Sequence, residues 1–141
     1  MTAVSSPASA QRIPARWPVH LLRAATTGVS VLVLMQAALA GSFLSGGFEA
    51  LAAHARNGGL TGLLLIVQTV AAFTCARKGL ATRQPVLASV VQLVIVGVLF
   101  PLGEQRILVA HVPLAVLLTV GVLQTTHTAW RRTPLEPEHS R

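Results

Sequence analysis

Four long uncharged runs, separated by charged residues, constrain this chain more than any other feature of its sequence. They cover residues 24–48, 57–76, 84–103 and 107–130, and they contain 25, 20, 20 and 24 residues. Because a helix rises about 1.5 Å per residue, about 20 residues cross a hydrocarbon core of roughly 30 Å. Each run is therefore long enough to span a membrane once.

The composition agrees with this interpretation. Of the 141 residues, 52% are apolar and only 11% are charged, and the mean hydropathy is +0.65. Soluble domains have about twice that share of charged residues. We therefore predict an all-α fold, an integral membrane four-helix bundle. It would occupy residues 19–130, between a disordered cytoplasmic tail at 1–18 and a second cytoplasmic tail at 131–141.

The basic residues predict how the bundle is oriented. The net charge is +7, and nine of the eleven Lys and Arg residues fall on one side of the four spans. By the positive-inside rule, both termini are expected in the cytoplasm of a bacterial-type cell membrane. The charge then reflects membrane orientation, and we expect no nucleic-acid partner. The nine residues are Arg12, Arg16, Arg23, Arg77, Lys78, Arg83, Arg131, Arg132 and Arg141.

Two parts of the chain share a pattern of Gln-x4-Gly, a turn and Ala-His. The glutamine and histidine are Gln36 and His54 in the first copy, 18 residues apart, and Gln92 and His111 in the second, 19 apart. We interpret this as a tandem repeat of two helical hairpins, at about 22–78 and 84–130. Chance alignment of two Ala-, Val- and Leu-rich segments is the alternative. The repeat predicts a bundle built from two tandem two-helix hairpins.

Each hairpin carries one histidine near its outer end, His54 or His111. Ionisable groups inside a bilayer are costly and usually face a bundle interior with a partner. Because the two hairpins run in the same direction, a pseudo-twofold axis along the membrane normal would bring His54 opposite His111. Two imidazoles facing one another across a four-helix bundle can supply both axial ligands of a six-coordinate haem.

A haem also needs a flat slot and positive charge near its propionates. Small residues at helical spacing could line the slot, and the two outward-facing arginines could pair with propionates. The candidate slot residues are Gly41, Gly58, Gly62 and Gly97, and the candidate propionate partners are Arg56 and Arg106.

Val109-Ala110-His111 in a Leu- and Val-rich span, Ala53-His54 with an arginine close behind, and the two-hairpin unit together resemble one half of the haem A synthase type of membrane protein. The chain is also similar to small four-span bacterial membrane proteins. The resemblance implies two histidines at the outer end of a four-helix unit. The catalytic half of that family has a glutamate three residues before a His-Arg pair, whereas Glu49 is five before His54 here. This departure argues against haem oxidation chemistry and leaves haem ligation open.

Three functions remain open from the sequence. The first is a haem-b-binding membrane protein that transfers electrons or handles haem near the outer face, with a redox partner or a homodimer as its protein partner besides lipid. The second is a non-catalytic small membrane subunit or assembly factor whose histidines are hydrogen-bonded within the bundle. The third is a transporter or proton relay, which the lack of acidic residues within the spans disfavours. No catalytic residue is predicted, and enzymatic activity stays open.

Two further features have simple interpretations. Cys75 is the only cysteine, so an intramolecular disulfide is excluded and a packing role is expected. His127 lies 16 residues after His111, about 160° around an ideal helix. It should point away from a slot shared with His111, as an interfacial polar residue.

Overall fold

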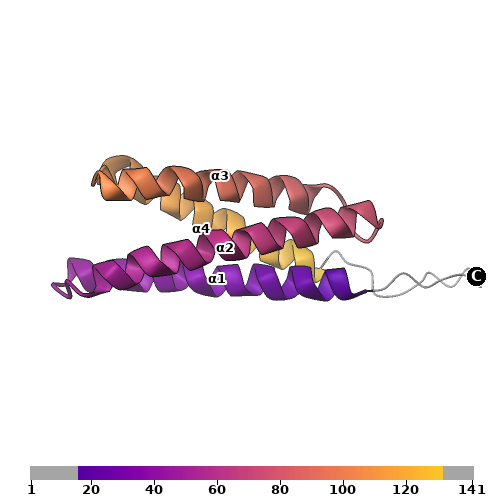
Figure 1. The fold of residues 1–141 in the computed structure, drawn as a ribbon, viewed down its shortest axis with the longest axis horizontal. Helices are drawn as coiled ribbons and strands as arrows, with labels where there is room; N and C mark the ends of the chain where they lie inside the picture. Colours follow the sequence, from indigo (N-terminus) through magenta and orange to yellow (C-terminus); the bar gives the residue numbers. More distant parts are fainter. Residues whose placement is uncertain (1–15, 132–141) are drawn as a thin grey trace, which may run out of the picture.

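The computed structural model describes residues 16–131, which form four helices (Figure 1). They are α1 (Trp17–Leu44), α2 (Ala50–Arg77), α3 (Gln84–Glu104) and α4 (Leu108–Arg131). All four are long and apolar enough to cross a membrane. The chain is an all-α, multi-pass membrane protein, as the four uncharged runs predicted.

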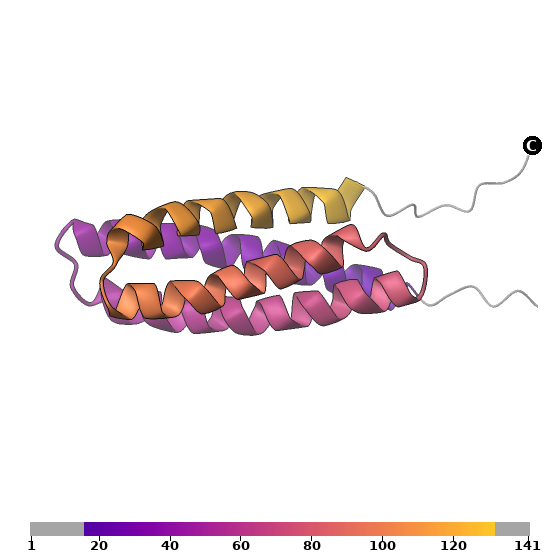
Figure 2. The ribbon, with the colours of Figure 1, turned by 90° about the horizontal axis from the view of Figure 1, so that it is seen from above.

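The helices form two antiparallel hairpins, α1–α2 and α3–α4, packed into one bundle (Figure 2). Each helix contacts two neighbours, because α2 also packs against α3 and α4 returns to α1. The diagonal pairs, α1 with α3 and α2 with α4, make no direct helix contact within the described residues. Side chains from α2 and α4 can therefore meet only across the centre of the bundle.

The helix boundaries differ slightly from the expected spans. Helix α1 begins at Trp17, five residues before the expected Leu22, with Pro18 in its first turn where a missing N–H costs nothing. Helix α2 begins at Ala50, seven residues before the uncharged run that starts at residue 57. The predicted tails lie largely outside the described residues, although Trp17, Pro18 and Arg131, which they included, are helical.

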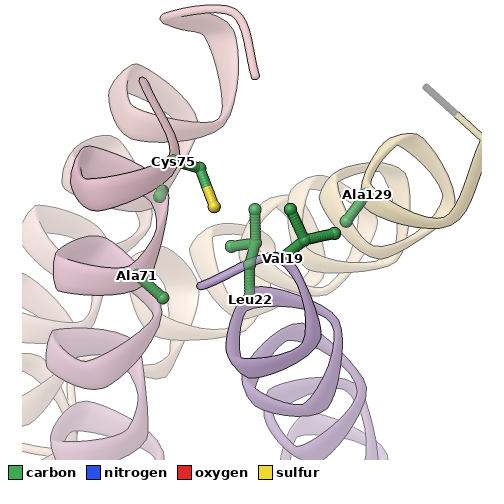
Figure 3. Close-up of a cluster of buried hydrophobic side chains, with 6 residues drawn as sticks. Val19, Leu22, Ala71, Cys75 and Ala129 are labelled. Carbon is green, nitrogen blue, oxygen red and sulfur yellow. The ribbon is translucent and has the colours of Figure 1, made fainter. Parts of the chain in front are cut away.

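The two ends of the bundle differ, and we name them by their contents. The terminal end holds the start of α1, the end of α2, the start of α3 and the end of α4. Its core is a cluster of small and branched apolar side chains, Val19, Leu22, Ala71, Ala72, Cys75 and Ala129 (Figure 3). Cys75 is buried in this cluster and has no disulfide partner, in line with the expected packing role. A second cluster, Val29, Val33, Leu65, Val96, Leu118 and Val122, fills the middle.

Hydrogen bonds between helices reinforce the terminal end and the middle. Along the α1–α4 seam, the Thr126 hydroxyl donates to the Thr26 carbonyl at 2.9 Å and lies 2.8 Å from the Ser30 hydroxyl. In the middle, Gln68 donates to Gln92 at 3.0 Å, and Gln92 donates to the Thr125 hydroxyl at 2.8 Å. This second chain of bonds links α2, α3 and α4 across the core.

The opposite end, which we call the histidine end, is open. No residue between 34 and 56 or between 97 and 117 is buried. Figure 1 shows the α1–α2 turn and the α3–α4 turn lying apart at this end, whereas α4 reaches α1 at the other. The helices are therefore held together at the terminal end and in the middle, and the two hairpins part where the histidines lie.

Candidate functional site

The two histidines meet at the open end. His54 lies one turn into α2, and His111 lies in the first turn of α4. The ring centroids are 6.4 Å apart, and the ring planes are inclined by 46°. Because α2 and α4 are diagonal in the bundle, each imidazole extends toward the centre from the opposite side. Both side chains are half-buried.

His54 is fixed by a hydrogen-bond network with α1. Its Nδ1 donates to the Gln36 carbonyl at 3.2 Å, and its Nε2 lies 3.4 Å from the Gln36 side-chain nitrogen. Since a carbonyl only accepts, the proton is on Nδ1, and Nε2 accepts from the Gln36 amide. Asn57 completes the network by donating to the Gln36 amide oxygen at 2.8 Å and to the Leu32 carbonyl at 2.9 Å.

His111 is held in a similar way by α3. Its Nδ1 donates to the Leu99 carbonyl at 3.1 Å. Within residues 16–131 its Nε2 has no hydrogen bond. A Cβ at Gly103 would lie 3.2 Å from His111 Cε1, so a larger residue would push the ring aside. Both imidazoles thus have Nδ1–H engaged by a backbone carbonyl, and in both the Nε2 lone pair is the group able to bind a metal.

The spacing of the rings suits two ligands on opposite sides of one metal ion. A metal–imidazole bond is about 2 Å, and a ring nitrogen lies about 1 Å from the ring centre, so the two centroids would be roughly 6 Å apart. Between residues 16 and 131, no group of three or more His, Cys, Asp or Glu side chains could hold a metal ion. In the described residues, the two imidazoles are therefore too few to form a metal site made of protein ligands alone.

The four glycines expected to line a slot do not gather at one place. Gly58 lies between α1 and α3, where an added Cβ would meet Gln36 at 3.3 Å and Phe100 at 3.8 Å. Gly62 faces Val96 of α3, and so serves helix packing. Gly41 and Gly97 face open space, with nothing within 4 Å of an added Cβ. Of the four, Gly58 alone borders the histidine network.

The two candidate propionate partners are both exposed and differ in placement. Arg56 is two residues after His54, about 200° around the helix, so it leaves the face from which the imidazole projects. Arg106 lies in the turn leading into α4, with a positive φ of 57°. It is five residues before His111, on the rim of the open end.

The repeat landmarks have different partners in the two hairpins. Gln36 bonds to His54, but its counterpart Gln92 bonds to Gln68 and Thr125, deeper in the core. Gln68, 14 residues after His54, is buried, whereas Gln124, 13 residues after His111, is exposed. The histidines keep their equivalence, and the glutamines have diverged in their surroundings.

The structure also brings forward residues that sequence reasoning did not assign to the site. Asn57 and Gly103 contact the histidine networks directly. Asn57 could have been assigned to the site from the sequence, because a polar residue three positions after His54 lies on the same helix face. Gly103, near the C-terminal end of α3, could not have been assigned from the sequence, because its role depends on the position of α4.

His127 and His20, the other two histidines in the described part of the chain, are at the terminal end and exposed, away from the pair. The chain matches no protein-family model, no curated protein and no solved structure. The resemblance to one half of the haem A synthase type therefore stays a prediction.

Proposed function

We propose that this protein binds haem b at the histidine end, with His54 and His111 as axial ligands. The observation that carries the proposal is the pair of imidazoles on diagonal helices, 6.4 Å apart, each with Nδ1–H bonded to a carbonyl. Metal-binding histidines characteristically donate their second ring N–H to a carbonyl or carboxylate, which sets the tautomer and strengthens the ligand.

The surrounding residues would have distinct roles. The Gln36 and Leu99 carbonyls orient the rings, and Gly103 leaves room for the His111 ring. The Gln36 amide, which now donates to His54 Nε2, would have to turn away to release that nitrogen. Arg106 is the cation placed to pair with a propionate, since it lies on the rim near His111.

A haem with two imidazole ligands supplies one-electron chemistry and leaves no open position for a substrate. Electron transfer or haem handling follows as the role of the protein. We further propose that both termini are cytoplasmic and that the site is near the outer face, because nine of the eleven cations fall on the terminal side. A redox partner or a second copy of the chain would then dock at the open end.

The test is an absorption spectrum of the full chain, expressed with ample haem and purified in detergent, before and after dithionite reduction. The expected result is a Soret band with sharp reduced α and β bands, lost in His54→Ala and His111→Ala. The matched controls are His20→Ala and His127→Ala, which remove histidines from the terminal end and should leave the spectrum intact. Circular dichroism checks that each variant remains helical.

Protein that stays colourless under these conditions would contradict the proposal. The alternative is a non-catalytic membrane subunit or assembly factor, which the bonds of His54 to Gln36 favour, since they already satisfy the imidazole without a cofactor. In that case His54→Ala would lower the stability of the apoprotein, and His111→Ala, which removes one hydrogen bond, would lower it less.

A further inference from the structure

Arg23 is the buried charge that the histidine site leaves unexplained. It lies on α1 at the terminal end and is only 8% exposed. Its Nε donates to the Ala129 carbonyl of α4 at 3.2 Å, and its guanidinium lies 5.1 Å from the centre of the Trp130 ring. The carbonyl bond suits a cation near the C-terminus of α4.

That bond uses one of the five N–H donors of the guanidinium. Within residues 16–131, the two terminal nitrogens of Arg23 make no hydrogen bond. Neither is a fully buried atom without a partner, so both reach the surface of the protein. The guanidinium is therefore held in place through Nε, and its two terminal nitrogens remain available as hydrogen-bond donors.

No acidic residue in the described part of the chain is near enough to balance this charge. Glu49 and Glu104 both lie at the histidine end. The terminal end instead gathers six cations, Arg16, Arg23, Arg77, Lys78, Arg83 and Arg131. A guanidinium that is mostly buried among further cations would be stabilised by an anion from outside the bundle.

The neighbours of Arg23 lie near the ends of α1 and α4, where membrane-spanning helices meet lipid headgroups. Trp130 is 56% exposed, and its indole nitrogen donates to the Thr27 hydroxyl at 3.2 Å. Tryptophan at a span end marks the interface between membrane and water. His20, one turn before Arg23 on the same face of α1, is exposed as well. The α1–α4 seam thus presents a fixed guanidinium, an indole and an imidazole to the headgroup region.

We propose that Arg23, with Trp130 and His20, binds the phosphate group of an anionic phospholipid at the α1–α4 seam. Arginine pairs with phosphate through two parallel N–H···O bonds, and basic pockets between membrane helices bind anionic headgroups in this way. The acyl chains would lie along the apolar outer faces of α1 and α4. The site is independent of the histidine pair at the opposite end.

The experiment uses the full chain with Trp17→Phe, which leaves Trp130 as the single tryptophan. The protein is reconstituted in phosphatidylcholine nanodiscs that contain increasing fractions of phosphatidylglycerol with brominated acyl chains, and Trp130 fluorescence is recorded. Brominated phosphatidylcholine serves as the neutral reference. We expect quenching by the anionic lipid at several-fold lower mole fraction than by the neutral lipid.

Arg23→Gln should weaken the preference for the anionic lipid roughly tenfold, because charge-assisted hydrogen bonds are lost. Arg77→Gln is the matched control: it removes a cation of the same end that lies over Phe73 on α2, away from the seam. It should retain the preference. Equal losses in both variants, or equal quenching by the two lipids in the starting protein, would overturn the proposal.

Three further measurements separate lipid binding from misfolding, from free-phosphate binding and from competition within the chain. If Arg23→Gln does not fold, Arg23→Lys retains the charge but not the fork, and it should still lose part of the preference. Excess inorganic phosphate should not relieve the quenching; relief would mean that the ligand is free phosphate. Glu136→Gln with Glu138→Gln should change nothing, whereas stronger lipid binding in that variant would mean that these two carboxylates compete for Arg23.

Discussion

The terminal end and the histidine end of this bundle are built from similar apolar helices, yet only one of them is closed. At the terminal end, α1 and α4 are joined through Arg23, Ser30 and Thr126, above a core that contains Cys75 and Ala129. At the histidine end, no residue from 34 to 56 or from 97 to 117 is buried. There the two hairpins are bridged mainly by two imidazoles.

The difference shows what holds membrane helices together. Lipid tails are as apolar as leucine, so burial from water does not drive helices against each other, and packing and interhelical hydrogen bonds decide where they close. The terminal end and the middle have both. The histidine end has its hydrogen bonds mostly within hairpins, from His54 to α1 and from His111 to α3, so they do not join the two hairpins to each other.

The largest effect should come from truncating a leucine in the packed middle. Leu65 is 0% exposed, whereas Leu51, at the histidine end of the same helix, is 48% exposed. Leu65→Ala should lower the free energy of unfolding by about 2–4 kcal/mol, since it leaves a cavity. Leu51→Ala should lower it by less than about 0.5 kcal/mol. Reversible unfolding in mixed micelles, followed by circular dichroism, measures both; equal losses would mean that the histidine end is packed too.

The two glutamines of the repeat offer a second comparison. Gln92→Leu removes the acceptor of Gln68 and the donor to Thr125, so it should cost about 1–2 kcal/mol of unfolding free energy. Gln36→Leu leaves the backbone carbonyl that holds His54 Nδ1, and it frees Nε2. It also removes the Gln36 acceptor of Asn57, which keeps the Leu32 carbonyl, so it should cost about 0.5–1 kcal/mol, less than Gln92→Leu, and tighten haem binding.

Haem titration of apoprotein, followed at the Soret band, measures the second effect for Gln36→Leu. A variant that loses haem while remaining helical would show that the Gln36 amide supports the cofactor-bound state instead of competing with the metal.

The smallest effect concerns the hydrogen bonds that close the α1–α4 seam. Thr126→Val removes the bonds to Thr26 and Ser30, and interhelical bonds in membranes are worth about 0.6 kcal/mol each on average. We expect a loss of about 0.6–1.2 kcal/mol in the same unfolding assay. Thr119→Val is the matched control, because the Thr119 hydroxyl bonds only to Ala115 of its own helix, and it should change stability by less than the error of the measurement.

Much of the fold could be predicted because the length of a membrane span depends mainly on the length of an apolar run and on the charged residues that bound it. The start of α3 at Gln84, and the level of both histidines along the bundle, follow from charged residues that cannot enter the hydrocarbon core. The site was harder to predict. Gly41 and Gly97 were expected beside Gly58 in one slot, but they face open space, since the direction of a helix face depends on how the neighbouring helices are rotated.

The sequence by itself determined the membrane class, the four spans, their pairing into hairpins and the level of His54 and His111 along the bundle. These depend on hydrophobic length and short turns, which are local properties. Only the tertiary structure decided that the two rings come within 6.4 Å, that Gln36 bonds to His54 while Gln92 bonds elsewhere, and that Arg23 is buried beside Trp130. Each residue turns the helix face by about 100°, so such partners depend on small rotations that packing sets for the whole bundle at once.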